Sequence, residues 1–180
     1  IITLIDSNKD KAIEIATEAI NSFEKIYEEK WLNMMRDKLG LFGEADNDQI
    51  LIMELLTWMH KNKADYTNTF CFLMNEKFSD NVIYNDKNFL VWKKKWEGRL
   101  KLNNNSQEKY LKLMHSVNPL VIPRNHKVEE ALTYANDGNI RPMQNLIEVL
   151  KNPYINHEEI VKYQLPDFNI EKKYQTFCGT

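Results

Sequence analysis

The sequence predicts an all-α fold, a multi-helix bundle, and three observations support this prediction. Apolar residues recur at three- and four-residue steps along several segments, which is the spacing of one helix face. Glycine and proline number only 5 each in 180 residues, too few for a β-sandwich with many tight turns. Serine, asparagine or aspartate, which cap helices, precede several of these segments. We therefore expect one helical domain over residues 1–165 and an irregular tail over residues 166–180.

The first helix is expected to begin after Asp6 or Ser7. Either side chain can cap it, because the side-chain oxygen accepts hydrogen bonds from N–H groups of the first turn. Gly40 and Gly43 are expected to end the helix, since glycine tolerates the left-handed turn found at helix ends. We expect one buried apolar stripe along this helix, formed by Ile13, Ala16, Ile20, Phe23, Tyr27, Trp31 and Met34.

A second helix should start near residues 46–48, and its apolar residues cover most of its circumference, so we expect it to be central. These residues are Ile50, Leu51, Ile52, Met53, Leu55, Leu56, Trp58 and Met59. A third helix is expected over residues 65–78, and residues 79–88 are expected to form a loop. The third helix should turn Phe70, Leu73 and Met74 inward.

Four more helices are expected in the second half of the chain. Phe89, Trp92, Trp96 and Leu100 have helical spacing, and the asparagines at 103–105 should end that helix. Ser106 can then cap the next helix, which contains Tyr110, Leu111 and Met114.

Residues 118–124 should be extended, because proline restricts its own backbone conformation and that of the residue before it. Asn125 can cap a helix that runs to Ala135, and residues 136–138 should form a turn. Pro142 fits the first turn of the following helix, which should end before Pro153. A short turn can follow Asn156.

Composition and charge exclude several classes of function. With 24 basic and 26 acidic residues the net charge is −2, which argues against the basic face of a nucleic-acid-binding protein. The two cysteines, Cys71 and Cys178, are too few for a disulfide-rich scaffold and favour a reducing compartment, the cytoplasm. No apolar stretch approaches the ~20 residues that span a bilayer. We expect neither nucleic-acid nor membrane partners.

No catalytic, cofactor-binding or metal site is predicted within these residues. The glycines stand at 40, 43, 98, 138 and 179, far apart, whereas a phosphate-binding loop needs them clustered. His126 has Glu129 and Glu130 one turn away, but imidazole–carboxylate pairing on one helix face is commonplace.

Two further features each allow a functional and a plain reading. The lysines at 93–95, between Trp92 and Trp96, suggest a base-stacking platform. However, tryptophans four residues apart share a helix face and the lysines lie mostly on the other, so we expect a core stripe with a solvated basic back. Cys178, in a polar tail, is a candidate accessible thiol, although an inert terminal cysteine is the simpler reading of the sequence alone.

Four stretches together resemble the selenoprotein O family, whose members have a protein-kinase-like fold and act as protein adenylyltransferases. The stretches are MRDKLGL at 35–41, ADYTNTF at 64–70, NPLVIPRNHKVEEAL at 118–132 and YQTFCGT at 174–180. The resemblance covers the C-terminal region of that family. It implies a parent protein that binds ATP and magnesium through residues upstream of this region, so none of those ligands is carried over here.

The resemblance also gives Cys178 a role. It matches the near-terminal cysteine or selenocysteine of the family, which implies redox control through a cysteine elsewhere in the parent protein. Cys71, flanked by Phe70 and Phe72, is expected to be buried and a poor partner for it.

Residues 118–125 have a structural explanation that needs no substrate. Beginning at Asn118, Pro119 and Pro123 fix an extended approach to the next helix, and Asn125 caps that helix. Arg124 is left free to pair with a carboxylate on another helix.

Two functions are compatible with these observations. The first is the C-terminal helical domain of an enzyme that transfers AMP from ATP to protein hydroxyls. This domain would support the missing N-terminal catalytic lobe, with Cys178 as a redox latch and protein substrates held by the parent. The alternative is a stand-alone helical protein-interaction module without enzymatic activity. The upstream reading frame separates them, because an enzyme requires a glycine-rich loop, a strand lysine and an aspartate–asparagine metal motif there.

Overall fold

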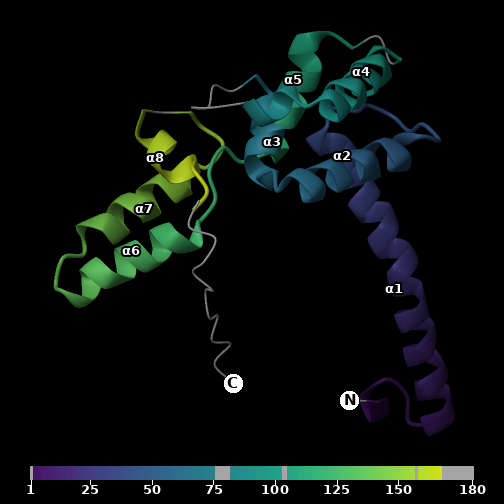
Figure 1. Cartoon of the computed structure of the whole chain (residues 1–180). Helices are drawn as coiled ribbons and strands as arrows, with labels where there is room; N and C mark the ends of the chain where they lie inside the picture. Colours follow the sequence, from purple (N-terminus) through teal and green to yellow (C-terminus); the bar gives the residue numbers. More distant parts are fainter. Residues whose placement is uncertain (1, 76–81, 103–104, 157, 168–180) are drawn as a thin grey trace.

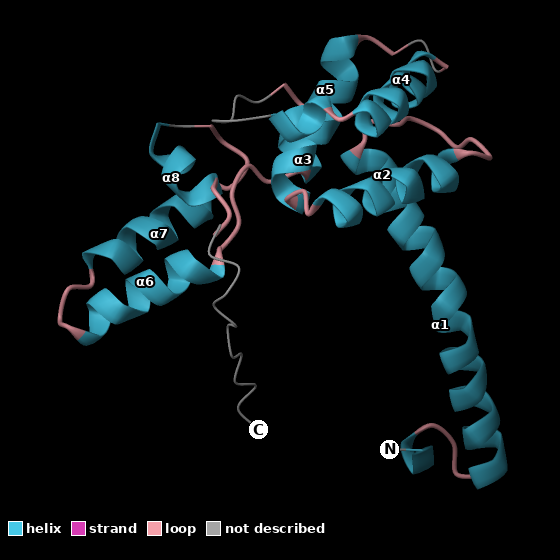
Figure 2. Ribbon diagram, in the orientation of Figure 1, coloured by secondary structure: helices cyan, strands magenta, loops and turns pink. Residues whose placement is uncertain are grey.

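The computed structural model describes residues 2–75, 82–102, 105–156 and 158–167, and these residues form helices connected by loops (Figure 1). Figure 2 shows no strand among them, so the predicted all-α class is confirmed. The α-helices are α1 (Lys9–Lys38), α2 (Asp48–Asn62), α3 (Tyr66–Leu73), α4 (Lys87–Lys101), α5 (Gln107–Val117), α6 (Asn125–Asn136), α7 (Arg141–Lys151) and α8 (Val161–Gln164). Short 3₁₀ helices are η1 (Ile2–Leu4), η2 (Val82–Asn85) and η3 (Glu158–Ile160).

The helices form three parts (Figure 1). A central body contains α2, α3, α4, α5 and the C-terminal end of α1, with α2 packed against α4 and α1 against α5. A hairpin of α6 and α7 lies beside this body, together with α8. The rest of α1 projects away from the body toward the N-terminus.

Aromatic side chains fill much of the core of the body. Trp92 and Trp96 stack with ring centroids 6.1 Å apart, and both are 3% exposed. Their indole N–H groups donate to the backbone carbonyls of Leu51 at 2.8 Å and Leu39 at 2.9 Å. The predicted tryptophan core stripe is confirmed, because this side of α4 faces α2 and the end of α1.

The start of α1 differs from the prediction. Its N-cap is Asn8, whose side-chain oxygen accepts hydrogen bonds from the N–H groups of Asp10 and Lys11. Asp6 belongs to the preceding turn, where it accepts from the Asn8 N–H at 2.9 Å and pairs with Lys11. The caps proposed at Asp6 and Ser7 are therefore wrong by one or two residues.

The buried stripe predicted for α1 is also wrong over most of the helix. Ile20 is 72% exposed, Phe23 65% and Tyr27 58%, because no other described element covers this side of α1. Only near its C-terminal end do side chains such as Met35 enter the core. The helix does end as predicted, at Lys38, followed by Gly40 with φ +68°.

Three smaller predictions need correction. Ile50 and Met53 on α2 are 59% and 48% exposed, because helices cover only part of the circumference of α2. Helix α3 stops at Leu73, and residues 76–78, predicted to continue it, lie outside the described residues. The loop predicted for residues 79–88 contains η2 and the beginning of α4.

Two further helix predictions are confirmed. Ser106 caps α5 by accepting from the Lys109 N–H, and Pro142 lies in the first turn of α7, which ends before Pro153. Within the described part of the chain, no helix is both long and apolar enough to cross a membrane.

Candidate functional site

The residues singled out from the sequence meet where the hairpin joins the body. The segment between α5 and α6 runs extended, and Leu120 and Val121 within it are 1% exposed. The Leu120 N–H donates to the carbonyl of Pro153 at 2.7 Å, which ties this segment to the chain that follows α7. Arg124 stands at the end of the segment, immediately before α6.

The Arg124 guanidinium binds three groups on two other helices. Its Nη1 and Nη2 donate to the two carboxylate oxygens of Asp65 at 2.5 and 2.9 Å. Nη2 also donates to the Asn68 side chain at 3.3 Å and to the backbone carbonyl of Gln164 at 2.8 Å. A two-pronged pair of this kind is among the stronger charge-assisted contacts in proteins. The pairing with a carboxylate on another helix, predicted for Arg124, is present.

Each partner of Arg124 is fixed by a second contact. Asp65 caps α3, because its Oδ1 accepts from the Asn68 N–H at 2.8 Å. The Gln164 side chain donates to the Leu120 carbonyl at 3.0 Å. The four residues Arg124, Asp65, Asn68 and Gln164, which we call the hairpin junction, therefore lock α3, α6 and α8 together.

Burial shapes this junction. The Arg124 side chain is 9% exposed and that of Asp65 20%. The Nε of Arg124 is buried and has no hydrogen-bond partner among the described residues. Asn125, predicted to cap α6, is not its cap. The extended backbone at Arg124 makes it the N-cap residue, and Asn125 becomes the first residue of the helix.

Asn118 connects the ends of α1 and α5. Its amide nitrogen donates to the carbonyls of Lys38 and Met114, each at 2.9 Å, and its oxygen accepts from the Lys38 ammonium at 3.0 Å. That ammonium lies 4.9 Å from the centre of the Phe70 ring. Burial lowers the pKa of Lys38. Asn118 is 1% exposed, and both polar atoms of its side chain bind other groups of the fold.

A second charged cluster lies in the body, around Asp48 at the start of α2. Its carboxylate accepts from Arg36 on α1 at 2.8 Å, from Arg99 on α4 at 2.6 Å and from the Ala45 N–H at 3.0 Å. Burial alone would raise the pKa of Asp48, but these hydrogen bonds hold the pKa below its ordinary value. The cluster stabilises the contact of α1, α2 and α4.

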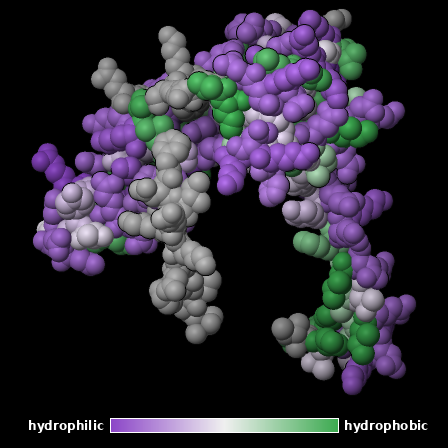
Figure 3. All heavy atoms as spheres, viewed as in Figure 1, coloured by the Kyte–Doolittle hydropathy of each residue, from purple (hydrophilic) through white to green (hydrophobic). Residues whose placement is uncertain are grey.

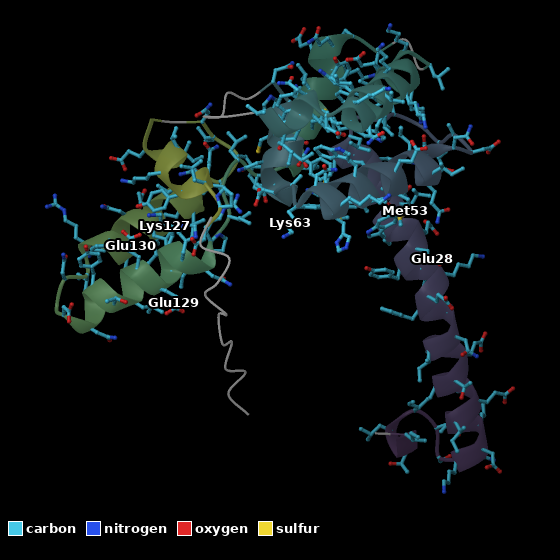
Figure 4. All side chains as sticks on the ribbon, in the orientation of Figure 1. Glu28, Met53, Lys63, Lys127, Glu129 and Glu130 are labelled. Atoms are coloured by element: carbon cyan, nitrogen blue, oxygen red, sulfur yellow. The ribbon has the colours of Figure 1, made fainter. Side chains whose placement is uncertain are left out.

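These arrangements do not fit ATP with magnesium. The described residues contain no group of three or more His, Cys, Asp or Glu side chains that could hold a metal ion. The buried arginines are committed to Asp48 and Asp65. On α6, Glu130 pairs with Lys127 at 2.7 Å, and Glu129 lies on the same exposed helix (Figure 4). Burial is the main cause that lowers the pKa of the neighbouring His126. These polar side chains therefore bind one another.

The two cysteines differ in what the structure says of them. Cys71 is fully buried in α3, as predicted, and its thiol donates to the Pro119 carbonyl at 3.6 Å. Cys178 lies outside the described residues, as does most of the predicted tail. Sequence reasoning missed the Asp48 cluster and Gln164, because Asp48, Arg99 and Gln164 lie outside the quoted stretches and their partners are distant in sequence.

Comparison with known proteins gives one consistent result. The family model for the protein adenylyltransferase SelO matches residues 3–151. The chain is 53% identical to a protein nucleotidyltransferase YdiU from Pelagibacter ubique and 45% identical to one from Clostridium perfringens. It is 44% identical to a third, from Alcanivorax borkumensis. In each case the match covers 100% of this chain but 37% of the relative, so the chain spans little more than a third of their length.

Proposed function

This chain belongs to the SelO family of protein adenylyltransferases, and we propose that it is the helical C-terminal part of an enzyme that transfers AMP from ATP to protein hydroxyls. The observation that carries the proposal is that the whole chain matches 37% of the length of relatives named nucleotidyltransferases. The same observation favours a part of a larger enzyme over a stand-alone interaction module. ATP, magnesium and the protein substrate would then be bound by the remaining, N-terminal part of the longer protein.

The role proposed for these 180 residues is to support that catalytic part. Arg36, Arg99 and Arg124 join helices, in the Asp48 cluster and the hairpin junction. Networks of this kind hold helices in one arrangement, which suits a rigid support. We also propose that Cys178 is a redox latch toward a cysteine of the catalytic part, and that the protein works in the cytoplasm.

The test compares three samples: the longer protein, the same protein without this region, and the 180-residue chain by itself. Each is incubated with magnesium, a protein acceptor and ATP labelled on its α-phosphate. We expect label transfer by the longer protein, a loss of at least 10-fold when this region is removed, and none by the chain alone.

Two outcomes would contradict the proposal. The first is a longer protein that transfers no AMP to any protein acceptor. The second is micromolar binding of ATP by the 180-residue chain, measured by calorimetric titration, that depends on one of its own residues.

A further inference from the structure

We propose that the projecting part of α1 docks through one apolar face on the portion of the longer protein that lies outside these 180 residues. The face, which we call the α1 stripe, consists of Ile13, Ala16, Ile20, Phe23 and Tyr27. The inference rests on the proposed function and adds to it the surface through which the support is made.

The geometry of α1 calls for a partner. The helix has 30 residues and is therefore ~45 Å long at 1.5 Å per residue. Between residues 9 and 30 only Ala12 is buried, and the helix extends away from the body (Figure 1). An isolated helical arm of this kind draws little stability from tertiary contacts, although packing of an amphipathic face is what usually stabilises helices in proteins.

The α1 stripe has the pattern of such a face. Its members are spaced by three or four residues, so they lie on one side of the helix. Ile20, Phe23 and Tyr27 are more than half exposed, and Figure 3 shows a strip of hydrophobic atoms along this arm. The rings of Phe23 and Tyr27 stack with centroids 6.0 Å apart, so the two exposed side chains form one aromatic patch.

The opposite face of the arm is charged. Glu14, Glu18, Lys25 and Glu29 fall on the side away from the stripe at 100° per residue. Figure 4 labels Glu28 on the same helix, and at this spacing Glu28 lies on the flank of the stripe. Acidic residues outnumber basic ones here, whereas helices that lie on membranes carry lysine and arginine on their polar face. The charges therefore argue against a lipid surface as the occupant.

The length of the relatives argues for the same polypeptide as the occupant. This chain matches only 37% of each of them, so most of the longer protein lies outside these 180 residues. A surface on a covalently joined segment meets the stripe at a high effective concentration, which a second copy of the protein cannot match at ordinary dilution.

The test measures thiol accessibility in the longer protein. Ile20→Cys places a thiol in the stripe, and Glu18→Cys places one on the charged face of the same turn of helix. Labelling by a maleimide is followed at each cysteine by mass spectrometry. In this chain both positions are exposed, so a difference between their labelling rates in the longer protein would come from docking. We expect Ile20→Cys to react at least 10-fold more slowly than Glu18→Cys, and at the same rate in denaturant.

Tyr27→Cys is a second stripe variant at a position 58% exposed in this chain, and it leaves Ile20 in place, so it tests docking even if the loss of Ile20 weakens the contact. Equal rates for Tyr27→Cys, Ile20→Cys and Glu18→Cys would overturn the proposal. Protection that appears only at concentrations where the protein dimerises, or only with anionic lipid vesicles, would also overturn it.

Assaying AMP transfer in the same preparations separates this inference from the proposed function. Active protein with unprotected stripe cysteines would refute the docking face alone. Protected cysteines in a protein that transfers no AMP would support the docking face and refute the proposed function.

Discussion

Replacing Arg124 by alanine should destabilise the domain strongly, because this side chain joins the hairpin to the body. The substitution removes both bonds to the Asp65 carboxylate, together with those to the Asn68 side chain and the Gln164 carbonyl. The Asp65 side chain, which is 20% exposed in the present structure, would then lack its cation.

The magnitude follows from these contacts. Removing one partner of a buried ion pair costs roughly 3–5 kcal/mol, mainly because the other charge is stranded. Two features place Arg124→Ala at the lower end, about 3 kcal/mol. Asp65 keeps the Asn68 N–H as a donor, and the variant also removes the buried Nε that has no partner among the described residues. For a domain of this size, about 3 kcal/mol corresponds to a drop in Tm of roughly 6–12 °C.

Chemical denaturation of the longer protein or of the isolated chain measures the change. Arg141→Ala is the matched control, since Arg141 is exposed at the start of α7 in the same hairpin and should cost no more than about 0.5 kcal/mol. Asp65→Asn keeps an N-cap acceptor for α3, so a double-mutant cycle with Arg124→Ala isolates the ion pair. An unchanged midpoint for Arg124→Ala, or additive effects in the cycle, would refute this reasoning.

Three further predictions concern the rest of the chain. Asp48→Asn should lower the free energy of unfolding by about 3–5 kcal/mol at neutral pH, because it strands two buried arginines. The pKa of Asp48 is lowered in the fold, so its stabilising contribution is present above the unfolded pKa of about 3.9 and is lost as pH falls through the folded pKa. Acid denaturation of the variant should therefore be less steep below about pH 4. Gly40→Ala should destabilise the domain more than Gly138→Ala in urea denaturation. Both glycines have positive φ, but a Cβ at Gly40 would meet side-chain atoms at 3.0 Å, whereas one at Gly138 would meet nothing within 4 Å. Equal losses of unfolding free energy would contradict this packing. Iodoacetamide should label Cys178 faster than Cys71, which is fully buried; in the longer protein Cys178→Ser should abolish any activity difference between oxidising and reducing buffers, and persistence of that difference would place the redox control elsewhere.

Local sequence determined where the helices lie. Ser106 caps α5 and Pro142 opens α7 because capping and proline geometry act within a few residues. The four-residue spacing of Trp92 and Trp96 fixed which side of α4 is buried, and the short sequence stretches were sufficient to indicate the family. The predicted cap of α1 is wrong by one or two residues, since neighbouring polar side chains compete for that role. The predicted cap of α6 is wrong by one residue, because the extended backbone at Arg124 makes that residue the N-cap.

Only the tertiary structure decided which helix faces are covered and which charges meet. The periodicity of α1 does place its apolar residues on one face of the helix. Burial of Ile20 and Phe23, however, requires another element to lie against them, and none of the described elements does. The ion pairs of Asp48 and Arg124 join residues 12, 51 and 59 positions apart. Pairing of Arg124 with a carboxylate on another helix was predictable, but no local pattern identifies Asp65 as the partner or reveals the Asp48 pairs. Helix formation is governed by neighbours along the chain, whereas burial and ion pairing are governed by neighbours in space.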